Sequence, residues 1–254
     1  MDVVDLRDFY RTRLGQTAQR LIRRRIREIW PDLRGERLLG LGYAVPYLRP
    51  FVDEAESVIA FMPAGQGVMA WPARGPNRVA LVDETHLPLQ DASVSRVLMA
   101  HAVENSESYR RMLHEAWRVL EGNGRLMIVV PNRSGVWART DRTPFGHGHP
   151  FSVSQLGRLL SETQFIPKQQ HRALFIPPLE LKVLLAAAPA WERLGCKWLT
   201  TFGGVIVIEA SKQLYRPIQD GNRQRAAGIG AGIRAGARPA AGFSNADRLG
   251  HSKP

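Results

Sequence analysis

Cysteine is almost missing from this sequence. Cys196 is the one cysteine among 254 residues. A single thiol excludes an intrachain disulfide and a metal site built from several thiolates. This usage is typical of proteins that reside in a reducing compartment, so we expect a cytoplasmic location.

Long apolar runs are missing too. The longest is the eight-residue stretch VLLAAAPA at 183–190, which contains a proline. It is too short to cross a bilayer as a helix. The N-terminus shows no apolar run behind a basic start, so no signal peptide is visible. We therefore expect a soluble protein without a membrane span.

Basic residues outnumber acidic residues most strongly at the two ends of the chain. The sequence holds 35 Lys and Arg against 23 Asp and Glu, a net charge of +12. Residues 1–35 carry +4 and residues 212–254 carry +6, which leaves only +2 for residues 36–211. This distribution argues against a large basic face on the central domain. It allows weak contact of the two ends with nucleic acid or an anionic surface.

Large apolar residues become rare towards the C-terminus. Residues 212–254 are rich in Gly, Ala and Arg. Such a segment buries too little apolar surface to offset its ordering entropy, so we expect a disordered tail. The predicted organisation is a basic N-terminal helix in 1–35, a central domain in 36–211 and this tail.

Helical and strand-like patterns alternate through the central domain. Helical spacing of apolar residues predicts helices at 5–29, 47–55, 107–120, 152–163 and 179–194. Short apolar segments predict strands at 37–41, 57–62, 78–82, 93–101, 125–130, 171–176 and 203–210. This alternation predicts a doubly wound α/β fold with a mostly parallel, seven-stranded, Rossmann-like sheet.

Several blocks of sequence, taken in order, carry a family resemblance. LLGLGYA at 38–44 has the form of a strand and a glycine-rich loop, and VDETHLPLQDAS at 82–93 follows in the third-strand position. The block LHEAWRVLEGNGRL at 113–126 has the form of a helix, a glycine turn and a fifth strand. Together they resemble the class I S-adenosylmethionine-dependent methyltransferases of the small-molecule type. The resemblance implies S-adenosylmethionine as cofactor and an acceptor that the sequence does not identify.

The resemblance also implies a set of cofactor-binding residues. In the family, glycines let the loop backbone approach the methionine end, and polar side chains after the next strands hold adenosine. Carried over to this sequence, the set is Gly40, Gly42, Tyr43, Ala44, Met62, Asp83, Glu84 and His101.

This sequence departs from the family pattern at three places. Gly40 stands where the family usually has an acid, and Ala44 replaces the second glycine of the loop. The second strand ends in Phe61-Met62-Pro63, with no carboxylate for a ribose. Two interpretations stay open: a working methyltransferase with an unusual loop, or an inactive or weak relative that acts as a binding or regulatory partner. A nicotinamide-dependent dehydrogenase is disfavoured, because Val45 occupies the third glycine position and Ala60 the place of the expected acid.

The exits of the fourth and fifth strands hold the remaining candidates. His101 is the candidate catalytic residue, and Glu104 and Asn105 on the same loop either face the site or begin the next helix. The long polar loop at 131–150 is typical of a substrate loop, and its arginines suit an anionic acceptor. Predicted acceptor residues are Asn132, Trp137, Arg142, Phe145 and His147. His147 and His149 lack further ligands nearby, so we predict no metal site.

An apolar region at 179–190, continued by Trp191 and Trp198, lies beyond the expected core. It fits a lid helix, an extension of the core or a subunit interface. A protein partner or a homodimer is therefore open alongside the unidentified acceptor.

Overall fold

The computed structural model describes residues 1–198 and 200–214. Its helices are α1 (Val3–Arg11), α2 (Arg13–Ile29), α3 (Val45–Leu48), α4 (Tyr109–Val119), α5 (Val153–Glu162), α6 (Lys182–Ala186) and α7 (Ala188–Trp198). Its strands are β1 (Arg37–Gly42), β2 (Ser57–Pro63), β3 (Val79–Val82), β4 (Val94–Ala100), β5 (Leu120–Pro131), β6 (Phe165–Ala173) and β7 (Val205–Lys212). All but the first three residues of the predicted tail lie outside the described residues.

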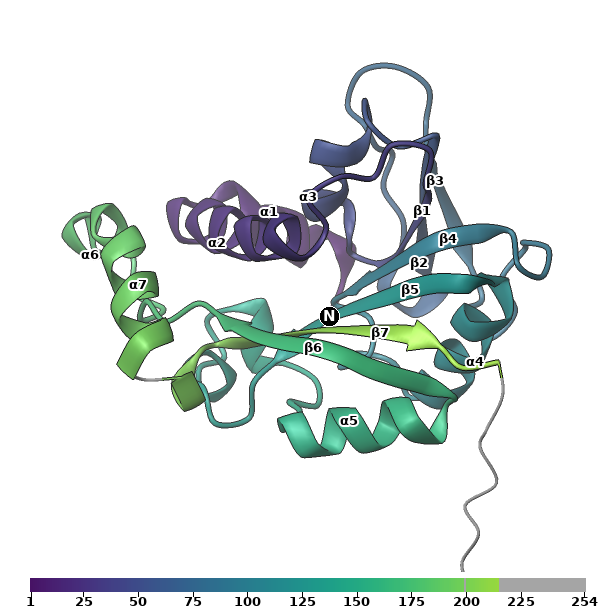
Figure 1. The fold of residues 1–254 in the computed structure, drawn as a ribbon. Helices are drawn as coiled ribbons and strands as arrows, with labels where there is room; N and C mark the ends of the chain where they lie inside the picture. Colours follow the sequence, from purple (N-terminus) through teal and green to yellow (C-terminus); the bar gives the residue numbers. More distant parts are fainter. Residues whose placement is uncertain (199, 215–254) are drawn as a thin grey trace, which may run out of the picture. The chain divides into compact units, whose positions relative to one another are not determined.

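The seven strands form one twisted sheet in the order β3-β2-β1-β4-β5-β7-β6 (Figure 1). Strands β1 to β5 are parallel, whereas β7 runs antiparallel to both β5 and β6. The predicted fold class is confirmed. From β1 the strand order runs to one side through β2 and β3, and from β4 it runs to the other side. The carboxyl ends of the parallel neighbours β1 and β4 therefore mark the topological switch point, where ligands bind in open α/β sheets.

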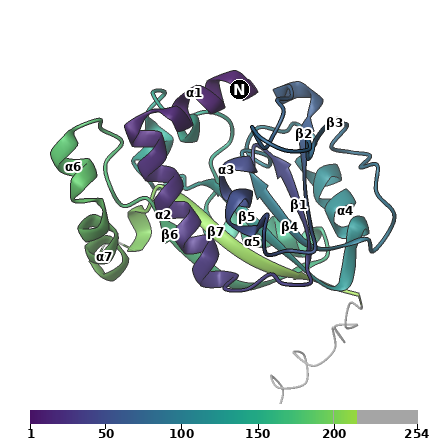
Figure 2. The same ribbon diagram turned by 90° about the horizontal axis from the view of Figure 1, so that it is seen from above.

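Helices cover both faces of the sheet (Figure 2). One face packs against α1, α2 and α3, where residues such as Leu6, Ile22 and Tyr47 join the core. The other packs against α4 and α5 through residues such as Met112 and Leu156. The central strands are apolar on both faces, as expected for a buried parallel sheet. The N-terminal basic segment is thus part of the main core.

The predicted single helix at 5–29 is wrong, because the chain turns at Thr12. Thr12 has extended backbone angles, and its hydroxyl accepts a hydrogen bond from the Gly15 amide while donating to the Phe9 carbonyl. It therefore caps α2. A Cβ on Gly15 would lie 2.0 Å from the Phe9 oxygen, so only glycine allows this tight corner. The turn brings α1 across the carboxyl edge of the sheet.

Other boundaries also differ from the predictions. The predicted helix at 47–55 is reduced to α3 and one 3-10 turn at Arg49–Phe51, since Pro50 lacks an amide hydrogen for a longer helix. The predicted helix at 179–194 is the pair α6 and α7. The predicted strand at 171–176 is β6, which begins six residues earlier. Most residues of β6 are exposed and several are polar, as is typical of an edge strand, so a search for apolar segments does not detect its first half.

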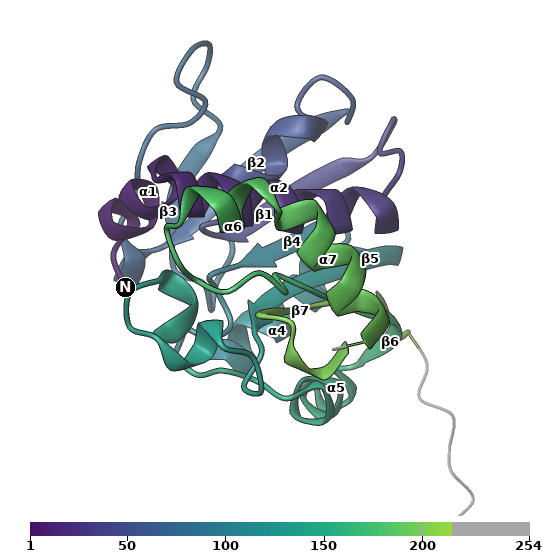
Figure 3. The same cartoon turned by 90° about the vertical axis from the view of Figure 1, so that its left-hand side faces the viewer.

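The pair α6 and α7 follows β6 and lies beside α2 (Figure 3). Ala188 is buried in the core that α1 and α2 share, whereas Val183 and Trp198 are largely exposed. No helix in the two described ranges is long and apolar enough to cross a membrane.

Candidate functional site

The carboxyl ends of β2, β3 and β4 surround a cavity of about 370 Å³. Its lining comes mainly from the segments that follow these three strands. The lining residues are Met1, Pro63, Gly65, Gln66, Glu84, Ala102, Asn105, Ser106, Glu107 and Ser108. Because ligands of such sheets bind beyond the carboxyl ends of the strands, this cavity is the candidate ligand site.

Polar side chains converge on the cavity. Glu84 is half-buried and accepts a hydrogen bond of 3.1 Å from the Ser106 hydroxyl. Gln66 is buried, its amide nitrogen donates to the carbonyl of His101, and its Oε1 has no partner in the described structure. Asn105 donates to the same carbonyl at 3.2 Å. The cavity therefore borders His101 and offers several hydrogen-bond acceptors.

Asp83 and Glu84 are adjacent in sequence but lie in different surroundings. The Asp83 side chain is 62% exposed and accepts hydrogen bonds from the hydroxyl and the amide of Thr85, at 2.7 and 2.8 Å. These bonds lower the pKa of its carboxyl below the usual value. Asp83 thus caps its own turn, and the structure brings only Glu84 of this predicted pair to the cavity wall.

The glycine-rich loop after β1 packs against the protein itself. Gly42 has φ of +81°, and a Cβ there would lie 2.5 Å from the Ala100 oxygen and 2.7 Å from the Ala102 Cβ. A Cβ on Gly40 would lie 2.5 Å from the Leu48 side chain. Ala44 and Met62 are buried in the core. These glycines allow close packing of the loop, and their predicted contact with a cofactor stays a prediction.

Three tyrosines form a cluster beyond β1 and β4, and one of them, Tyr10, contacts His101. Tyr10 stacks on Tyr43 with ring centroids 5.9 Å apart. The Tyr10 hydroxyl lies 2.6 Å from the Tyr47 hydroxyl and 2.7 Å from Nε2 of His101. Burial raises the pKa of Tyr10 and Tyr47, and it raises the pKa of Tyr43 to about 12. All three phenols therefore stay protonated at neutral pH.

His101 and Glu104 form a buried pair beside this cluster. His101 has a φ of +52°, a strained value that non-glycine residues rarely adopt. Its Nδ1 lies 3.4 Å from Oε1 of Glu104, and both side chains are 1% exposed. Among the described residues, neither carboxylate oxygen of Glu104 has a hydrogen-bond partner. Since a buried carboxylate without partners is costly, the pair is suited to a cationic or proton-donating ligand.

The loop after β5 reaches the same cluster through Phe145. The Phe145 ring lies 5.0 Å from the His101 ring and 5.5 Å from that of Trp137. Trp137 is buried and donates from Nε1 to the Ile176 carbonyl at 2.7 Å. Phe145 therefore forms a wall of the His101 cluster, with Trp137 packed behind it.

The other predicted acceptor residues have different surroundings. Asn132 is buried and donates from its amide to the carbonyls of Thr201 and Gly203, at 2.9 and 2.7 Å. Nε2 of His147 lies 2.9 Å from the Asp141 carbonyl, and Arg142 is exposed. Asn132 thus stabilises the approach to β7, and nothing in these contacts ties His147 or Arg142 to His101.

Sequence reasoning misses several residues of the site, among them Tyr10, Tyr47 and Gln66. The pattern places Tyr10 only among the apolar residues of the predicted helix at 5–29, and Tyr47 only at the start of the predicted helix at 47–55. Gln66 follows β2 in a turn without a recognisable pattern. A buried polar tip on an apolar helix face is the one signal that favours Tyr10, because such hydroxyls need partners.

Comparisons with known proteins agree with this geometry. Residues 39–128 match the model of a methyltransferase domain. In two strains of Mycobacterium tuberculosis, a protein named as a probable S-adenosylmethionine-dependent methyltransferase is 35% identical over 82 residues. That match covers 32% of this chain and 30% of each relative, so the chain aligns with about a third of their length.

Solved structures share the fold over most of the chain. A Thermotoga maritima methyltransferase, described as a possible histamine N-methyltransferase, superposes with a TM-score of 0.57 at 17% identity, covering 83% of this chain and 96% of that one. The [4+2]-cyclase SpnF superposes with a TM-score of 0.55 at 24% identity, covering 79% and 83%. Strand order, the position of the cavity and the matched domain model agree: residues 39–128 resemble a methyltransferase domain, and the chain has the fold of S-adenosylmethionine-dependent methyltransferases.

Proposed function

We propose that the chain is an S-adenosylmethionine-dependent methyltransferase that holds the adenosine end of its donor in the cavity beside Glu84. The acceptor chemistry of this cavity carries the proposal. Glu84, Asn105 and the unpartnered oxygen of Gln66 line it. The hydroxyls and the amine of adenosine donate hydrogen bonds, so they match this set.

The charge of the donor also fits the site. A sulfonium is a cation, and the buried carboxylate of Glu104, whose oxygens accept no hydrogen bond among the described residues, offers a counter-charge beside His101. The faces of Tyr10 and Tyr43 provide further favourable contact for a cation. These groups would compensate the charge of the sulfonium, whereas the ribose, which the acid missing at the end of β2 usually holds, is left to Glu84.

When bound, S-adenosylmethionine supplies an electrophilic methyl group on sulfur. The chain then has to hold the acceptor atom in line with that group, so positioning dominates the catalytic task. Phe145 closes the site beside His101 and excludes water. Nε2 of His101, reached directly or through the Tyr10 hydroxyl, takes the proton that the acceptor releases, and Glu104 stabilises the charged ring.

Calorimetric titration of the purified protein with S-adenosylmethionine and S-adenosylhomocysteine tests this function. We expect micromolar binding of one equivalent of each. Binding alone is not methyl transfer, since SpnF shares the fold and is described as a cyclase. The second measurement is therefore transfer of a labelled methyl group to a panel of small acceptors, with His101→Ala as the inactive comparison. Absence of binding at millimolar cofactor would contradict the proposal and favour a regulatory role.

A further inference from the structure

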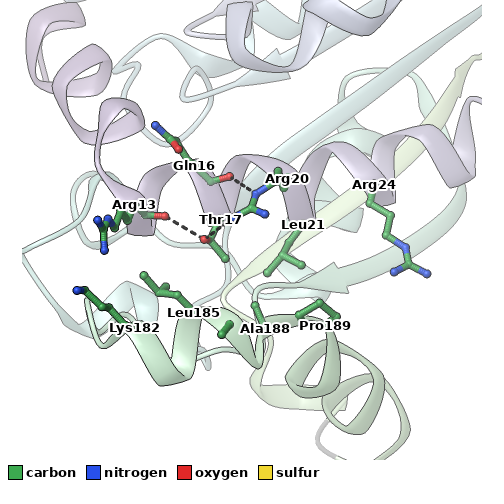
Figure 4. Close-up of a pocket in the computed structure, with 11 residues that line it drawn as sticks. Arg13, Gln16, Thr17, Arg20, Leu21, Arg24, Lys182, Leu185, Ala188 and Pro189 are labelled. Atoms are coloured by element: carbon green, nitrogen blue, oxygen red, sulfur yellow. Dashed lines mark hydrogen bonds between the residues drawn. The ribbon is translucent and has the colours of Figure 1, made fainter.

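A second and larger cavity lies outside the candidate methyltransferase site. It occupies about 600 Å³ between α2 and the pair α6 and α7. Figure 4 shows its two walls, with Arg13, Thr17, Arg20, Leu21 and Arg24 on α2 facing Lys182, Leu185, Ala188 and Pro189. We call this cavity the basic groove. Its volume is within the range of small-molecule sites.

The charged residues of the basic groove are all cations. Arg13, Arg20, Arg24 and Lys182 line it, and no carboxylate does. Arg20 donates to the Thr17 hydroxyl and the Gln16 carbonyl, and Arg24 pairs with the exposed Glu28. Arg13 and Lys182 have no side-chain partner within residues 1–198 and 200–214. They come from opposite walls at one end of the groove (Figure 4).

The basic groove also has an apolar lining, and its two ends differ in the charges that line them. Leu21, Leu185 and Pro189 supply apolar surface between the charged ends. Beyond Leu21 and Arg24 a smaller cavity of about 180 Å³ continues along α2, and its charged lining is mixed: Arg24, Arg25 and Arg193 with Glu28 and Glu192. An anion is therefore favoured at the end formed by Arg13 and Lys182, where no carboxylate lines the groove.

From these features we propose that the basic groove binds a small amphiphilic anion. Its carboxylate or phosphate head lies between Arg13 and Lys182, and its apolar body lies along Leu21 and Leu185. An extended nucleic acid is a poorer match, because no aromatic side chain lines the groove for base stacking. This site is separate from the methyltransferase cavity and stands whether or not that function is confirmed.

Calorimetry with octyl phosphate, octanol and inorganic phosphate tests the proposal. Octyl phosphate below its micelle concentration is expected to bind one site per chain, and octanol and inorganic phosphate should each bind roughly tenfold or more weakly. Arg13→Gln and Lys182→Gln should each weaken octyl phosphate binding roughly tenfold. Arg111→Gln is the matched control, because Arg111 is exposed on α4 at the other face of the sheet.

The outcomes separate a built site from surface attraction. Unchanged affinity in the Arg13→Gln, Lys182→Gln double variant would overturn the proposal, as would equal weakening by Arg111→Gln. Vesicles of phosphatidylglycerol provide a second arm, because binding to vesicles without binding to monomeric octyl phosphate would assign the cations to a membrane surface. Thermal unfolding of each variant shows whether it is folded, and S-adenosylhomocysteine affinity should stay unchanged in all of them.

Discussion

The two halves of the carboxyl edge of the sheet differ sharply. Beyond β1 and β4 the space is packed by Tyr10, Tyr43, Tyr47 and His101, with Gly42 pressed against the neighbouring strand. Beyond β2 and β3 the space is open, and a Cβ on Gly65 would meet no atom within 4 Å. The same edge thus contains one densely packed half and one open half, and the cavity for adenosine is proposed in the open half.

This contrast explains the unusual glycine-rich loop. A glycine in a ligand-binding loop and a glycine in a tightly packed loop look identical in sequence. Here the positive φ and the close approach of Ala100 account for Gly42 without any ligand. In the proposed function, recognition of adenosine then depends on side chains from the open half, chiefly Glu84 and Gln66.

Substitution of Gly42 or Gly65 by alanine should show the largest difference in stability between the two halves. Gly42→Ala places a methyl group against the Ala100 oxygen at a positive φ, so the free energy of unfolding should fall by about 3 kcal/mol or more. Gly65→Ala should change it by less than about 0.5 kcal/mol and weaken cofactor binding instead. Urea denaturation measures both. Equal destabilisation by the two variants would remove the distinction between the halves.

Substitution of the adjacent acids tests the open half directly. Glu84→Ala should weaken S-adenosylhomocysteine binding roughly 10- to 100-fold, because the charged hydrogen bond proposed between Glu84 and adenosine is lost. Asp83→Ala should leave the affinity within about twofold, since Asp83 bonds only its own turn. Calorimetry on both variants decides the matter. A greater loss in Asp83→Ala would restore the sequence-based assignment and reject the cavity wall described above.

Removal of the Tyr10 hydroxyl tests the hydrogen bonds of the packed half. Tyr10→Phe removes the partner of both Tyr47 and His101, so the free energy of unfolding should fall by about 1–2 kcal/mol. Tyr43→Phe is the matched control in the same cluster. Among the described residues, its hydroxyl has only a 3.8 Å contact with the Met69 sulfur, and the expected loss in the free energy of unfolding is below about 0.5 kcal/mol. Chemical denaturation compares them, and a greater loss in Tyr43→Phe would contradict the network.

The smallest expected effect concerns the ion pair of Arg27 and Glu54, which connects α2 with the segment after α3. Glu54 accepts two hydrogen bonds from Arg27, at 3.0 and 2.5 Å, and a third from the Leu33 amide. The Arg27 guanidinium lowers the pKa of Glu54 below its usual 4.5. A lowered pKa means that this stabilisation is present above about pH 4.5 and is lost as the pH falls through the folded-state value.

Glu54→Gln should therefore lower the free energy of unfolding by about 1 kcal/mol at pH 7 and by less at pH 3. Glu162→Gln serves as its control, because Glu162 and Arg110 form an exposed pair of little energetic value. Denaturation at both pH values measures the difference. A gap between wild type and Glu54→Gln that grows on acidification would contradict the assignment.

Much of the fold could be predicted because it depends on local patterns. The apolar runs at β1, β4 and β5 and the helical spacing at α4 and α5 persist in the structure. The prediction weakened where tertiary contacts override local preference, as at the Thr12 turn and in the polar edge strand β6. A corner built on Gly15 is a packing requirement between two helices, and no repeat in the sequence shows it.

The sequence by itself determined the resemblance to methyltransferases, the mostly parallel sheet and the edge at which a ligand is expected. These follow from the order of its apolar segments and from the blocks that carry the resemblance. Only the tertiary structure decided which polar groups meet. It turned Asp83 outward and Glu84 towards the cavity, and it joined Tyr10 to His101 across 91 positions. It also set Lys182 opposite Arg13. The physical reason is that periodicity fixes which face of an element is buried, whereas contacts between side chains far apart in sequence depend on how the elements pack.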